Sequence, residues 1–165
     1  MLRPDEFFIG TLSVAKPLSL VLPRSRYEQP MIVVGTPENP TAVFLGMEHQ
    51  FDAMPCNNNT SWHGLVIPNV KIEVDLASMF DPDQEARTPG CLVRDVSGLA
   101  ICAVSSDRYS LSGLELVPIP AQVPDSDSRM TVGFRRWAIV LGEGESRRTL
   151  RFIGDPEGPG PVQAG

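Results

Sequence analysis

FRRWAIVLGEGESRRTLRFI, residues 134–153, carries the clearest local signal for the fold of this chain. Two runs rich in apolar residues, Phe134–Leu141 and Arg147–Ile153, flank the sequence Gly142-Glu143-Gly144-Glu145. Glycine adopts the positive φ angles that tight connections between strands require. The segment therefore predicts a β-hairpin, and loops of two and of three residues both remain open.

The rest of the chain repeats this pattern of short apolar runs between turn residues. Its 16 prolines and 14 glycines separate runs that have the length of strands. Their spacing is close to that of sandwiches and barrels. We predict an all-β fold, a sandwich or barrel of about ten short, mainly antiparallel strands with at most one short helical segment. The predicted strands are Phe7–Val14, Leu18–Leu22, Met31–Val34, Thr41–Leu45, Trp62–Ile67, Val70–Val74, Cys91–Asp95, Leu99–Val104, Leu114–Ile119, Thr131–Leu141 and Thr149–Ile153.

Two hydrophobic patterns occur among these strands. In Val70–Asp75 apolar and charged residues alternate, which places Val70, Ile72 and Val74 toward a core and the charged residues toward water. Met31–Val34 is apolar throughout, which is typical of a strand covered on both faces. The chain is therefore expected to form more than one layer.

Helical signals are confined to Leu76–Arg87, where Asp75 or Ser78 can cap a first turn. Pro82 limits that segment to one or two turns, because a proline inside a helix removes a hydrogen bond and clashes with the preceding turn. A domain boundary in the proline-rich stretch Pro118–Ser128 would leave too few residues behind it for a stable second domain. We therefore expect one domain over residues 1–153 and a flexible Gly/Pro-rich tail over 154–165.

Composition narrows the class of protein. Hydrophobic residues make up 42% of the 165 residues, enough for a buried core, and the net charge of −6 argues against a general nucleic-acid or membrane-surface binder. The first ten residues lack the basic start and apolar run of a secretory signal. Three cysteines, an odd number without CxxC spacing, indicate free thiols in a reducing compartment. We expect a soluble, cytoplasmic protein.

The segment between the strands that end at Leu45 and begin at Trp62 is the most site-like part of the sequence. It holds His49, Asp52, Cys56 and His63, which are side chains of the types that bind zinc or other transition metals. Cys56 with a histidine base and Asp52 would also form a nucleophilic site. The intervals of seven residues from His49 to Cys56 and from Cys56 to His63 exceed the about two to five usual in zinc sites. In the structural alternative the segment is a turn and Cys56 a small buried residue.

Charge is distributed unevenly along the chain. Residues 1–128 hold 8 basic and 16 acidic residues, a balance of −8, whereas residues 129–165 hold 6 basic and 4 acidic, a balance of +2. Arginine and tryptophan dominate binding hot spots because they combine large contact area with directed polar groups. Alternatively, the arginines pair with the acidic body of the same domain and stack on the tryptophan. The candidate partner-binding residues are Arg135, Arg136, Trp137, Arg147, Arg148 and Arg151.

Two functions follow from these observations. The first is a non-catalytic protein-binding or assembly module, an accessory, subunit or immunity-like protein, whose hairpin contacts a protein with an acidic surface or a second copy of the chain. The alternative is a small metal- or cysteine-dependent enzyme that uses His49, Asp52, Cys56 and His63. We prefer the first because the sequence contains no catalytic motif, and it implies no cofactor, nucleic acid or membrane.

Overall fold

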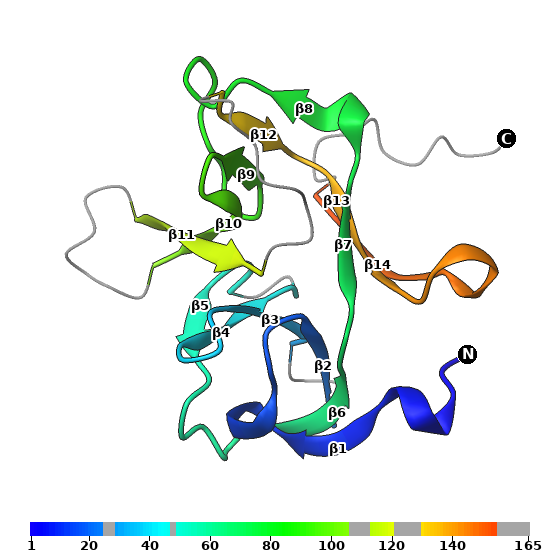
Figure 1. Ribbon diagram of the computed structural model, residues 1–165. Helices are drawn as coiled ribbons and strands as arrows, with labels where there is room; N and C mark the ends of the chain where they lie inside the picture. Colours follow the sequence, from blue (N-terminus) through cyan, green and yellow to red (C-terminus); the bar gives the residue numbers. More distant parts are fainter. Residues whose placement is uncertain (25–28, 47–48, 106–112, 121–129, 155–165) are drawn as a thin grey trace, which may run out of the picture.

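The structure, a computed structural model, describes residues 1–24, 29–46, 49–105, 113–120 and 130–154 (Figure 1). Over these residues the chain forms fourteen strands in three antiparallel sheets, which confirms the all-β prediction. At most one short helical segment was expected, within Leu76–Arg87, and the described residues contain four short 3-10 turns, of which only η3 (Leu76–Ser78) lies in that segment. The others are η1 (Pro4–Glu6), η2 (Leu12–Val14) and η4 (Gly144–Ser146). None of the helices in the described ranges is long and apolar enough to cross a membrane.

Sheet A has six strands in the spatial order β1-β6-β2-β3-β4-β5. Its central strand β3 is buried on both faces, as its unbroken apolar sequence predicted. Ile32 and Val34 enter the main core, while Met31 and Val33 enter a second cluster on the opposite face. The strands of sheet A are β1 (Phe8–Thr11), β2 (Ser19–Pro23), β3 (Met31–Gly35), β4 (Pro40–Phe44), β5 (Ala53–Pro55) and β6 (His63–Ile67).

Sheet B has five strands in the order β11-β10-β9-β12-β8. The longest of its strands, β10, pairs with β9 on one side and β11 on the other. Sheet B also carries a small satellite cluster of its own, formed by Phe80, Cys91, Val93 and Cys102. Its strands are β8 (Met79–Phe80), β9 (Leu92–Asp95), β10 (Gly98–Val104), β11 (Leu114–Ile119) and β12 (Val132–Phe134).

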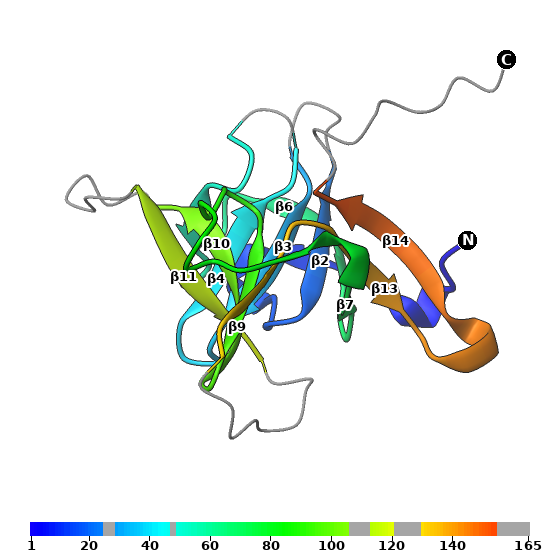
Figure 2. The same ribbon diagram turned by 90° about the horizontal axis from the view of Figure 1, so that it is seen from above.

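Sheet C has three strands in the order β14-β13-β7, with bounds Lys71–Val74 for β7, Trp137–Leu141 for β13 and Arg148–Ile153 for β14. The hairpin β13–β14 confirms the central prediction from the sequence, but its connection runs over residues 142–147 and contains η4, so it is longer than two or three residues. The prediction of a single strand over Thr131–Leu141 is wrong, because the structure has two strands there, β12 and β13. The chain passes from β12 in sheet B to β13 in sheet C at Arg135 and Arg136 (Figures 1 and 2).

That division between β12 and β13 has a local cause. The backbone N–H of Arg135 donates to Ser78 O at 3.2 Å, and the N–H of Arg136 donates to the Ser78 hydroxyl at 2.9 Å. Asp75, one of the two caps that the sequence offered, caps the turn η3, because its side chain accepts a hydrogen bond from Ala77 N at 2.9 Å. The capped turn therefore holds the two arginines where one sheet gives way to the next.

One core joins the three sheets. The largest cluster of buried side chains draws Leu20 and Ile32 from sheet A, Leu92 and Ile101 from sheet B, and Ile139 from sheet C. Each of these five side chains is at most 2% exposed. The predicted pattern of Val70–Asp75 also holds, with Val70 buried, Ile72 and Val74 half-buried and Glu73 exposed. The tail predicted for 154–165 and the irregular stretch at 118–128 lie mostly outside the described residues.

Candidate binding surface on sheet C

The predicted histidine and cysteine site comes together only in part. His49 Nδ1 lies 3.2 Å from Asp52 Oδ2 on the surface. Cys56 is fully buried in the second cluster, and this burial raises the pKa of its thiol to about 11, which disfavours the thiolate a nucleophile needs. His63 begins β6 opposite Thr11. No group of three or more His, Cys, Asp and Glu side chains converges within the described part of the chain.

The arginines of the hairpin region are held by acidic residues from elsewhere in the chain. Four of them have a carboxylate partner and each pair joins distant parts of the sequence. Half-exposed pairs of this kind contribute little individually to stability, but here they fix the orientation of the guanidinium groups. The pairs are Arg135 with Glu85 (2.7 Å), Arg136 with Asp75 (2.9 Å), Arg147 with Glu73, and Arg148 with Glu6.

Two of the predicted binding residues face the inside of the fold. Trp137 is 2% exposed and its indole Nε1 donates to Gly90 O at 2.8 Å. Arg151 lies opposite Ile139 on β13 and donates to Leu45 O at 3.0 Å. Arg135 stacks at 4.1 Å over the ring of Phe80, and not over Trp137 as the sequence suggested. Trp137 and Arg151 therefore support the hairpin from within.

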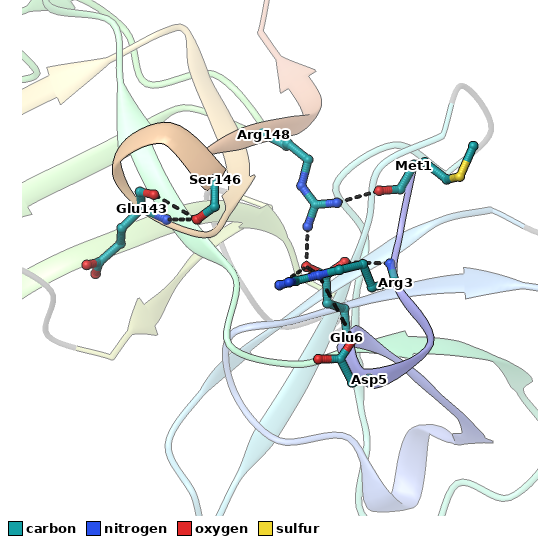
Figure 3. Close-up of polar contacts among 7 residues, drawn as sticks. All are labelled: Met1, Arg3, Asp5, Glu6, Glu143, Ser146 and Arg148. Carbon is teal, nitrogen blue, oxygen red and sulfur yellow. Dashed lines mark hydrogen bonds and ion pairs between the residues drawn. The ribbon is translucent and has the colours of Figure 1, made fainter.

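Arg148 ties the hairpin to the start of the chain (Figure 3). Its guanidinium donates to the Glu6 carboxylate and to Met1 O. Glu6 also accepts from Arg3 N at 2.7 Å and from the Arg3 side chain at 3.0 and 3.1 Å. These hydrogen bonds, the backbone one foremost, lower the pKa of Glu6 from 4.5 to about 2. In the adjacent loop the Ser146 hydroxyl donates to Glu143 O at 2.7 Å.

The outer face of sheet C is hollowed along one row of side chains. Ala138 of β13 lies directly between Glu73 of β7 and Phe152 of β14. Opposed residues of antiparallel strands point to the same face, so the short alanine side chain leaves a depression between two longer ones. The resulting groove has a volume of about 630 Å³, within the range of ligand-sized pockets. It is lined by Glu73, Val74, Asp75, Arg136, Trp137, Ala138, Arg147, Phe152 and Ile153.

The rim of this groove combines an apolar side and a charged side. Phe152 is 81% exposed on the β14 side. On the β7 side Arg147 donates to both oxygens of Glu73, which lowers the pKa of Glu73 and raises the pKa of Arg147. Arg136 pairs with Asp75, yet its Nε is buried and has no hydrogen-bond partner among the described residues. An unpaired buried donor of this kind is unfavourable, and Arg136 lines the groove.

Sequence reasoning located Arg136, Trp137 and Arg147 but missed the other residues that line the groove. Phe152 was assigned to a strand without a role, and Glu73 was expected only to face water. The missing information was the register of the strands. Ala138 lies opposite both Glu73 and Phe152 only because of strand pairings between residues 65 and 14 positions apart. A signal was present in the alternation of Leu150–Ile153, in which Phe152 falls on the face opposite Ile153.

Comparison with known proteins gives a family but no activity. The model of a family described as "Uncharacterised protein y4lG" matches residues 9–157. A relative from Sinorhizobium fredii (strain NBRC 101917 / NGR234), described as uncharacterized protein y4lG, is 44% identical over 150 residues, which is 91% of this chain and 91% of the relative. No solved structure matches the chain.

Proposed function

We propose that this chain, which belongs to the y4lG family, is a non-catalytic protein-binding module that captures a segment of another protein in the groove on sheet C. The observation that carries the proposal is the position of Phe152, which is 81% exposed at the edge of a concave surface of about 630 Å³. A single exposed apolar residue is ordinary on a protein surface. An aromatic residue beside a hollow is typical of the anchors of binding sites.

The lining of the groove determines the chemistry of the partner. Its floor at Ala138 and its wall at Phe152 accept an apolar side chain, whose burial removes apolar surface from water. The Arg136 guanidinium, whose Nε has no hydrogen-bond partner among the described residues, donates to a carboxylate or a carbonyl oxygen of the partner. A segment with an apolar residue next to an acidic one matches both features. The proposed partner is still acidic, as the sequence predicted, but its acidic contact is limited to the one residue that binds Arg136.

The net charge of −6 is consistent with such a local contact. A broadly acidic partner surface would be repelled by the body of this chain, where Glu73 and Asp75 line the same groove. We therefore expect moderate affinity that weakens as salt concentration rises. The proposal places the protein in the cytoplasm, in keeping with its three free cysteines.

The alternative, a metal- or cysteine-dependent enzyme, has less support from the geometry. Its best feature is the contact of His49 with Asp52 at 3.2 Å. The nucleophile it needs, Cys56, is enclosed in a hydrophobic cluster with a raised pKa. We therefore propose no reaction for this loop.

The test compares partner capture by variants of the groove and of an unrelated surface. Cross-linking in the native cell with wild type identifies the partner, and its binding constant is then measured for Phe152→Ala, Arg136→Gln and Phe8→Ala. Phe8 is the control, because it is an exposed phenylalanine (42%) on β1 in sheet A. We expect Phe152→Ala to weaken binding by about ten-fold or more and Arg136→Gln by less, and Phe8→Ala to have no effect.

Circular dichroism shows that each variant is folded before binding is compared. A folded Phe152→Ala protein that binds the partner as wild type does would remove the proposal. Equal losses for Phe152→Ala and Phe8→Ala would also count against it, since they would place the contact outside the groove.

A further inference from the structure

Cys91 and Cys102 face each other across a β-bulge at the start of β9. Gly90 N donates to Cys102 O at 2.7 Å, and Cys102 N donates to Cys91 O at 2.9 Å. Gly90 has φ +84°, so two residues of one strand oppose a single residue of the other in the arrangement known as a G1 bulge. The bulge sets the two cysteines opposite each other, and both side chains belong to the same buried cluster.

The surroundings of this pair differ from those of Cys56. Cys91 and Cys102 lie in the satellite cluster with Phe80 and Val93, outside the main core. Arg135 lies over the ring of Phe80. The neighbouring thiol of Cys102, foremost, and the positive charges of Arg135 and Arg87 lower the pKa of Cys91. The proximity of Cys91 and burial raise the pKa of Cys102. Cys91 is thus the member of the pair that takes the thiolate form.

We propose that Cys91 and Cys102 form a reversible oxidation site that closes to a disulfide in the presence of a peroxide. The thiolate of Cys91 attacks one oxygen of the peroxide and breaks the O–O bond, giving a sulfenic acid and releasing hydroxide when the oxidant is hydrogen peroxide. The thiol of Cys102 then attacks the Cys91 sulfur, the S–S bond forms, and water leaves with the proton of Cys102. A dithiol reductant reverses the reaction by exchange.

Access to the pair depends on a small opening of the structure. Both cysteines are 1% exposed, so peroxide must reach them through a local fluctuation. The satellite cluster has four buried members, and the segment 83–89 that precedes the bulge is exposed. Such an opening does not require the main core to separate.

The structure also provides a reporter of this reaction. Trp137 donates to Gly90 O, one residue before Cys91. A covalent bond at Cys91 shifts the bulge and therefore the surroundings of the Trp137 indole. The other tryptophan, Trp62, packs against Phe44 in sheet A at 5.6 Å between ring centres. A Trp62→Phe background isolates the fluorescence of Trp137.

The experiment treats the folded protein with dilute hydrogen peroxide, blocks the remaining thiols and digests with trypsin. Cleavage after Arg87, Arg94 and Arg108 separates the two cysteines into peptides 88–94 and 95–108. We expect these peptides to become joined and to separate again after dithiothreitol, together with a reversible change in Trp137 fluorescence. Cys56 is the internal control, and we expect its oxidation to be slower than that of Cys91 by about ten-fold or more.

Two variants define the order of the steps. In Cys102→Ser we expect a sulfenic acid on Cys91 that dimedone traps, whereas Cys91→Ser should give no trapped product on Cys102. Selectivity over Cys56 should disappear in urea, because the fold creates it. Peptides that stay separate while both thiols remain free, or oxidation of Cys56 at the same rate in the folded protein, would overturn the proposal.

Discussion

Gly90 lies where three parts of the molecule meet: the Phe51 ring, the Trp137 indole and the thiol pair. Its backbone has φ +84°, a region that side chains disfavour, and a Cβ at this position would meet the ring of Phe51. The carbonyl of the same residue accepts the indole hydrogen bond. No other residue type meets these three conditions without displacing a neighbour.

Gly90→Ala is therefore expected to lower the free energy of unfolding by about 2 kcal/mol or more, from the backbone strain and the clash together. Gly144→Ala is the matched control, because Gly144 also has a positive φ (+53°) but open space around its Cβ position. Urea denaturation of both variants separates the two contributions. Equal losses would show that the Phe51 ring moves aside.

Glu6 links stability to pH. Its pKa in the folded protein is about 2, below its ordinary value of 4.5, so the folded state favours the carboxylate. The stabilisation that Glu6 provides is fully present above pH 4.5 and is lost as the pH falls toward 2. Protonation then weakens its contacts with Arg3 and Arg148.

We predict that Glu6→Gln makes stability less dependent on pH between about 4.5 and 2, as measured by urea denaturation at stepped pH. Asp5→Asn is the control, because it removes a carboxylate of the same turn whose side chain is 76% exposed. A wild type and a Glu6→Gln protein with parallel acid profiles would contradict the role of Glu6.

At the scale of elements, the hairpin β13–β14 contains an irregularity that sets the face of its residues. Ile139 pairs with Arg151 and Val140 pairs with Thr149, so Leu150 is an extra residue in β14. Successive strand residues point to opposite faces of a sheet. One extra residue therefore reverses the faces of all strand residues that lie beyond it along the chain.

Deleting Leu150 should therefore destabilise the protein more than Leu150→Ala. The substitution removes a half-buried side chain at about 1–2 kcal/mol. The deletion also moves each of Arg148 and Thr149 to the face of the sheet opposite to its present one, which separates Arg148 from Glu6. Thermal unfolding followed by circular dichroism compares the two, and an equal loss would mean that the register adjusts without cost.

The sequence allowed the elements to be predicted better than their partners. Val70–Asp75 and Met31–Val34 reveal strands because alternation and unbroken apolarity follow directly from burial on one face or two. β5 was missed inside the segment interpreted as a loop, because Ala53–Pro55 is too short to show a pattern. The groove could not be foreseen, since Arg147 meets Glu73 across 74 residues and no local pattern encodes such a pairing.

On the scale of the whole molecule, the sheets share one core. Ile32 of β3 and Ile139 of β13 belong to the same cluster and both are 0% exposed. A shared core makes separate unfolding of sheets A and C unfavourable, because either sheet would expose the apolar face of the other.

Hydrogen exchange tests this cooperativity. We expect the amides of Ile32 and Ile139 to exchange with the same free energy, and Ile139→Val to lower both by about 1 kcal/mol. The amide of Ile9 on the edge strand β1 serves as the control, because it exchanges through local fraying. An Ile32 amide unchanged by Ile139→Val would show that the sheets open independently.

The passage of the chain from β12 into β13 also bears on how the protein is made. β7 is complete at residue 74, but its partner strand β13 begins only at residue 137. During synthesis β7 therefore waits for more than a third of the chain, and Trp137 reaches the core late. Contacts so distant in sequence form slowly. The apolar side of β7 is then the part of the nascent chain that stays exposed longest and is most prone to association, since its partner β13 is among the last strands to leave the ribosome.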